Sequence, residues 1–131
     1  MFGSIKKEVI SREAFDTLIG ANTTIEGNIS SGGTIRIDGK VNGNLNVEGD
    51  VYIGSEAFIT GNIHASSIHL SGTVQGNIRA TNLLRLLSTA KLYGDIQVQS
   101  FVADEGAVFQ GNCSMINAPA IESNSKVKIK N

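Results

Sequence analysis

The chain of 131 residues has one cysteine, one proline, no tryptophan and only 18% charged residues. A lone Cys113 excludes an internal disulfide, and one cysteine with two histidines cannot supply the four nitrogen and sulfur ligands of a structural zinc site. No apolar run approaches the roughly 20 residues of a membrane span, and the N-terminus lacks the apolar core of a secretory signal. We therefore expect a cytoplasmic protein without a metal.

Charge of either sign is also scarce, since 11 basic and 12 acidic residues give a net charge of −1. The basic residues between positions 16 and 123 are scattered: Arg36, Lys40, Arg79, Arg85 and Lys91. Nucleic acids are bound by clustered cations, so we expect no nucleic-acid partner. Hydrophobic residues still make up 40% of the chain, which predicts one folded domain rather than a disordered protein.

Glycine is plentiful, with 15 residues, and it marks a repeat. Six segments read apolar, polar, Gly, Asn or Asp, then apolar or Cys, with central glycines 15 to 18 residues apart: 25–29, 41–45, 59–63, 74–78, 92–96 and 109–113. Alternation with period two predicts short strands that bury one face. A strand–helix–strand unit needs about 30 residues, so the repeat fits one coil of a parallel β-helix, with three short strands per coil.

The repeat predicts which residues stack from coil to coil. An interior column would contain Ile25, Val41, Ile59, Val74, Leu92 and Phe109. A corner would carry a ladder of Asn28, Asn44, Asn62, Asn77, Asp95 and Asn112. Side-chain amides at corners satisfy nearby backbone groups, so we interpret the ladder as structural rather than as a row of ligand-binding residues.

Residues suited to catalysis are few, and we predict that the chain is not an enzyme and uses no cofactor. Cys113 occupies the repeat position of Ile29 and Ile96, so we expect a small buried side chain there. His64 and His69 are five residues apart, a spacing that does not place both on one face of a strand. A metal pair is therefore not expected.

The two ends of a β-helix expose edge strands and apolar interior that need a cover. Residues 1–17 are too short and mixed to form a substantial capping helix, and the chain after Pro119 is polar and basic. We therefore predict that the ends pair with other copies of the chain and build a filament. The expected interface residues are Leu18, Ile19 and Ile25 at one end, and Phe109, Cys113 and Met115 at the other.

The first residues are a candidate membrane contact. Phe2, Ile5 and Val9 have helical spacing, with Lys6 and Lys7 beside them. Such apolar side chains can insert at a lipid surface while lysines meet anionic head groups, and a filament would strengthen a weak anchor by avidity. The predicted contact consists of Met1, Phe2, Ile5, Lys6 and Lys7; the alternative is a solvated tail.

Several stretches resemble the bactofilins, bacterial polymer-forming cytoskeletal proteins. They include Thr-Leu-Ile-Gly at 17–20, Ile-Glu-Gly-Asn-Ile at 25–29, and the segments 35–45, 90–96 and 106–115. The resemblance covers about residues 17–116. It implies a right-handed, triangular β-helix of about six coils over residues 17–121, flanked by flexible tails at 1–16 and 122–131.

The resemblance also implies a function. Members of the family assemble end to end, without nucleotide, into non-polar filaments in which like ends meet. They act as scaffolds for cell shape, envelope synthesis or motility machinery, in some cases attached to the inner face of the membrane through their tails. For this chain we therefore expect a homopolymer with protein clients that the sequence does not identify.

An enzyme remains the alternative. Residues 53–61, Ile-Gly-Ser-Glu-Ala-Phe-Ile-Thr-Gly, resemble a hexapeptide of the left-handed β-helix acyltransferases, which would form trimers. Those enzymes also have coils of about 18 residues. Sixfold spacing does not persist beyond this stretch, and the coils vary in length, so the filament-forming scaffold is the preferred interpretation.

Overall fold

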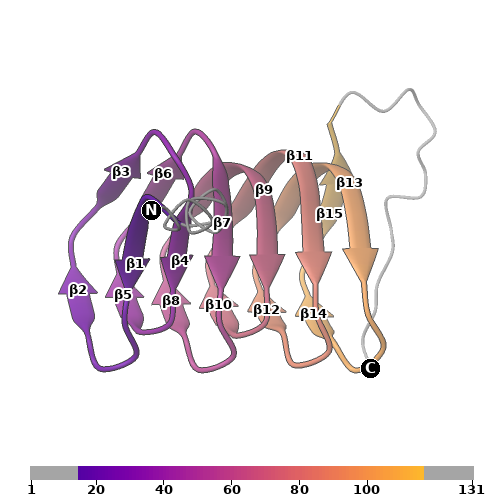
Figure 1. Cartoon of the computed structure of the whole chain (residues 1–131). Helices are drawn as coiled ribbons and strands as arrows, with labels where there is room; N and C mark the ends of the chain where they lie inside the picture. Colours follow the sequence, from indigo (N-terminus) through magenta and orange to yellow (C-terminus); the bar gives the residue numbers. More distant parts are fainter. Residues whose placement is uncertain (1–14, 117–131) are drawn as a thin grey trace, which may run out of the picture.

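A computed structural model describes residues 15–116, which form a parallel β-helix with no α-helix among them (Figure 1). Fifteen strands wind through six coils, and all of the strand pairs are parallel. In Figure 1 the strands nearest the viewer run downward while the coils advance from left to right, which makes the helix right-handed. The predicted fold class is confirmed.

Each coil contributes to three faces. Face 1 contains β2 (Thr24–Glu26), β5 (Lys40–Asn42), β8 (Phe58–Thr60), β10 (Thr73–Gln75), β12 (Lys91–Tyr93) and β14 (Val108–Gln110). Face 2 contains β3 (Ile29–Ser31), β6 (Leu45–Val47), the first parts of β9 (Ile63–Leu70), β11 (Ile78–Leu86) and β13 (Ile96–Ala103), and β15 (Cys113–Met115). Face 3 contains β1 (Thr17–Ile19), β4 (Ile35–Ile37), β7 (Asp50–Ile53) and the second parts of β9, β11 and β13.

The strands β9, β11 and β13 are longer than the repeat predicts. Each continues from face 2 around a corner onto face 3, and the register of β11 shifts between Ala80 and Leu83 at that corner. In the first two coils the same corner contains Gly32, Gly33 and Gly49, and the strands stop there. Glycine weakens strands. The later coils have no glycine at this corner, so β9, β11 and β13 each continue around it as one bent strand.

The predicted interior column is confirmed by the register of face 1. Ile25 pairs with Val41, and the pairing continues through Ile59, Val74, Leu92 and Phe109. All of these side chains except Ile25 are buried. Matching columns of aliphatic residues line the other two faces, so a continuous apolar core runs along the axis.

The predicted ladder is also confirmed. From the second ladder residue onward, each backbone N–H donates to the side-chain Oδ1 of the ladder residue in the preceding coil, at 2.9 to 3.1 Å, from Asn44 N to Asn28 Oδ1 up to Asn112 N to Asp95 Oδ1. The adjacent glycines are packed just as closely, because a Cβ on Gly94 would overlap the carbonyl oxygen of Gly76. The Gly-Asn pair therefore forms a corner that can stack repeatedly.

Candidate interfaces at the two ends of the β-helix

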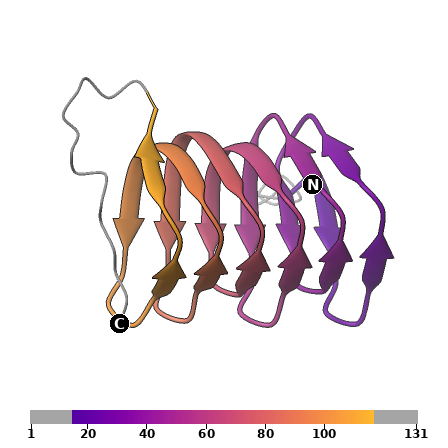
Figure 2. The same ribbon diagram turned by 180° about the vertical axis from the view of Figure 1, so that it is seen from behind.

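Both ends of the β-helix present strands that are paired on one side only within residues 15–116. At the N-terminal end, β1, β2 and β3 pair with β4, β5 and β6. At the C-terminal end, β14 pairs with β12, β15 with the first part of β13, and the second part of β13 with β11. Figures 1 and 2 show no other described element across either end. Such edges are templates for strand pairing with another chain.

The N-terminal end combines one buried and several accessible apolar side chains. Ile19 faces the interior and is buried, whereas Ile25 is half-buried against the core. Leu18 points to the outside of face 3 and is 63% exposed. The three residues predicted for this end therefore share the first coil but lie on different sides of it. Ile29, also half-buried against the core, was not predicted, although it is the first described member of its column.

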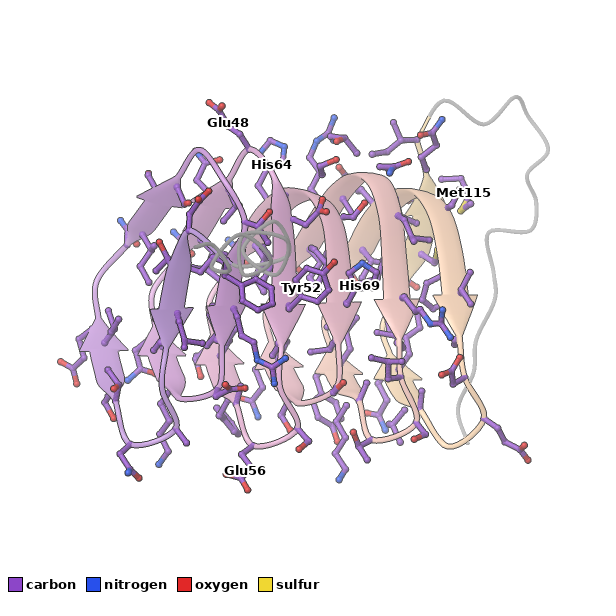
Figure 3. All side chains as sticks on the ribbon, in the orientation of Figure 1. Glu48, Tyr52, Glu56, His64, His69 and Met115 are labelled. Carbon is purple, nitrogen blue, oxygen red and sulfur yellow. The ribbon has the colours of Figure 1, made fainter. Side chains whose placement is uncertain are left out.

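The C-terminal end is larger than the sequence predicted. Phe109 is only 2% exposed, because its ring packs edge-to-face against Phe101, with centroids 5.8 Å apart. The accessible apolar surface comes from three side chains that are half-buried against the core: Phe101, Ala103 and Met115. Met115 is labelled near this end in Figure 3. The missed residues Phe101 and Ala103 follow Leu84 and Leu86 by 17 residues, a spacing within the range of the repeat.

Cys113 is a core side chain at this end. It pairs in register with Ile96 and is buried, as its position in the repeat predicts. Its Sγ donates to Met115 Sδ at 3.9 Å, and burial raises the pKa of the thiol. A raised pKa keeps the thiol protonated at neutral pH, which does not favour a nucleophilic role.

The two histidines lie on different faces of the solenoid because β9 bends at the corner between them, whereas their spacing predicts opposite sides of one strand. His64 is on the face 2 part of β9 and His69 is on the face 3 part (Figure 3). The His69 ring stacks on Tyr52 with centroids 4.6 Å apart, and Phe15 contacts Tyr52 edge-on at 5.3 Å. Burial lowers the pKa of His69, with a further lowering from Arg85 that Asp50 opposes. Within residues 15–116 no group of three His, Cys, Asp or Glu side chains could hold a metal ion.

The predicted membrane contact, which consists of Met1, Phe2, Ile5, Lys6 and Lys7, lies outside the described residues. The same is true of residues 117–131 at the other terminus. The part of the chain that the structure describes has no helix long and apolar enough to cross a membrane.

Comparison with known proteins identifies the family to which this solenoid belongs. The sequence model of the bactofilins, described as polymer-forming cytoskeletal proteins, matches residues 17–114, most of the chain. The chain belongs to the bactofilin family. It is similar to bactofilin BacO of Myxococcus xanthus, with 29% identity over 100 residues that cover 76% of this chain and 79% of BacO. Bactofilin BacP of the same organism is 26% identical over 100 residues, which cover 76% of this chain but only 42% of BacP.

Solved bactofilin structures share the fold. A cryo-EM reconstruction of double helical filaments of Thermus thermophilus bactofilin matches with a TM-score of 0.70 and 30% identity, covering 74% of this chain and 96% of that one. A crystal structure of a phenylalanine-to-arginine mutant of the same bactofilin matches with a TM-score of 0.64 and 29% identity, covering 67% and 98% of the two chains. The left-handed acyltransferase alternative fits neither the family nor the right-handed coil.

Proposed function

We propose that this bactofilin is a cytoskeletal scaffold that polymerises by stacking its β-helices end to end. One observation carries the proposal: both ends present singly paired strands around a partly accessible apolar interior. The double helical filaments of the Thermus thermophilus relative support it. The substitution Phe109→Arg tests the assembly directly, because it changes one end of the solenoid and leaves the sides unaltered.

In the proposed filament like ends meet, so each junction is a two-fold contact in which the same patch is used twice. The C-terminal junction would cover the half-buried Met115, Phe101 and Ala103, which surround the already buried Phe109 and Cys113. The N-terminal junction would use Leu18, Ile19 and Ile25. Fully burying one such aromatic or aliphatic side chain contributes about 2 kcal/mol, and continued strand pairing adds to it. Burial and pairing of this kind need no nucleotide.

We further propose that the filament lies in the cytoplasm and attaches to the inner face of the membrane through residues 1–10. Phe2 and Ile5 would enter the lipid surface, and Lys6 and Lys7 would meet anionic head groups. One such anchor is weak, but many anchors on one filament bind together. There the filament would organise proteins of the cell shape, envelope or motility machinery.

A chain that begins at residue 11 should lose membrane binding and keep its ability to form filaments. We expect co-sedimentation with anionic liposomes to fall at least about tenfold, because both the apolar insertion and the lysine charges are removed. Removal of residues 122–131 is the matched control and should leave liposome binding unchanged. Undiminished sedimentation of the chain that begins at residue 11 would contradict the proposed anchor.

A further inference from the structure

A groove of about 480 Å³ follows the corner between face 1 and face 2, away from both ends of the solenoid. Two parallel rows of side chains line it. One row is the ladder residues Asn44, Asn62, Asn77 and Asp95; the other is the outward-facing column Asn46, His64, Arg79 and Gln97. The buried residues Leu45, Ile63 and Ile78 lie between the rows. Figure 2 shows the side of the molecule that carries face 2, and Figure 3 labels His64 on β9.

The hydrogen bonds of the ladder fix which polar atoms remain available in the groove. The Oδ1 atoms of Asn44, Asn62 and Asn77 each accept a backbone N–H from the next coil, at 2.9, 3.0 and 3.0 Å. These bonds use the amide oxygens and not the NH₂ groups, so they leave the two N–H donors of each side chain for other partners. The ladder thus offers a ligand mainly N–H groups.

The opposite row has the same character. Arg79 Nη1 donates to Gln97 Oε1 at 2.7 Å, which leaves the NH₂ group of Gln97 as a donor. Arg79 and His64 are exposed and supply further N–H groups. Among the described residues that line the groove, Asp95 is the only carboxylate; its Oδ1 accepts the N–H of Asn112 at 3.1 Å, and its Oδ2 remains an acceptor. The groove therefore has more available donors than acceptors.

We propose that this groove binds an extended, carboxylate-rich peptide segment of another protein. Its ladder row crosses four coils, about 14 Å at the usual strand spacing, which matches about four residues of extended chain. Peptide carbonyls and carboxylates are acceptors, and Arg79 can bind a carboxylate with two parallel hydrogen bonds. A second copy of the same groove would place donors against donors, so it does not fit as well. This site is on the side of the solenoid and does not depend on end-to-end assembly.

Fluorescence anisotropy with fluorescein-labelled hexaglutamate, at physiological salt, tests the proposal. Arg79→Gln should weaken binding about tenfold, because it removes the charged donor in the groove. Asp95→Asn should strengthen binding several-fold, because it removes the only negative charge and keeps an oxygen for the N–H of Asn112. Arg85→Gln is the matched control: Arg85 is also an exposed arginine, but it lies on face 3, where it pairs with Asp104.

Three results would overturn the proposal. The first is that hexaglutamate does not bind, and the second is that labelled hexalysine binds as tightly as hexaglutamate. The third is that Arg79→Gln and Arg85→Gln weaken binding equally, which would indicate diffuse electrostatic attraction rather than a site. Thermal unfolding of the three variants must match that of the unaltered chain, since all three positions are exposed. Repeating the titration with each variant in the Phe109→Arg background separates groove binding from any effect on assembly.

Discussion

Replacing Phe109 with arginine should convert filaments into dimers while the β-helix stays folded. In the isolated chain the longer side chain can extend through the open C-terminal end and keep its charge in water, because no described coil follows β14. In a C-terminal junction the same charge would be buried without a partner, which costs about 3 to 5 kcal/mol. The substitution also removes the packing of Phe109 against Phe101 within the chain. The N-terminal ends are unchanged and should still pair. Sedimentation velocity gives the size, and circular dichroism reports the fold.

Phe58→Arg is the matched control for this substitution. Phe58 is 38% exposed and lies on the outside of face 1, so the same chemical change there leaves both ends intact. Filaments should persist. Normal filaments from Phe109→Arg would count against the C-terminal junction, and monomers in place of dimers would show that unlike ends meet.

The second large effect is on stability, at Gly94. This residue has a φ of +145°, which side-chain-bearing residues rarely adopt, and a Cβ there would overlap the carbonyl oxygen of Gly76 in the preceding coil. Backbone strain of about 1 to 3 kcal/mol and overpacking of similar size should together lower the unfolding free energy of Gly94→Ala by about 4 kcal/mol. Urea denaturation in the Phe109→Arg background measures this value without interference from polymerisation.

Gly27→Ala separates the two causes of that loss. Gly27 has a similar φ of +132°, but it belongs to the first coil, and a Cβ there would meet no described atom within 4 Å. Only the backbone strain applies, so we expect a loss of about 1 to 3 kcal/mol. If the two substitutions destabilise the protein equally, close stacking of the glycine corners contributes nothing measurable to stability.

Much of the fold could be predicted because the same short sequence motif recurs in every coil. Each Gly-Asn corner needs a positive φ at glycine and a side-chain oxygen that the next coil can use, and the spacing of these corners sets the length of the coil. The column from Ile25 to Phe109 then follows from alternation alone. The hand of the coil does not follow from the repeat and was predicted only through the family resemblance.

Other features depended on contacts that the sequence does not display. Phe101 and Ala103 were missed because they lie in the second part of β13, which has no Gly-Asn corner of its own. Phe109 was predicted as the last residue of the interior column and as an interface residue, but the packing of Phe101 against its ring was not foreseen. The donor-rich groove was also missed. Its character depends on which atom of each asparagine is already hydrogen-bonded, and this is decided between coils rather than along the chain.

The axial repeat of filaments formed by the unaltered chain, measured by electron microscopy without nucleotide, tests the account most directly. Six coils spaced by about 4.8 Å make a subunit roughly 30 Å long, so like-to-like stacking gives filaments that repeat every two subunits, at about 60 Å. We predict that repeat. A single small species at every protein concentration would contradict end-to-end assembly, and a repeat of about 30 Å would contradict the pairing of like ends.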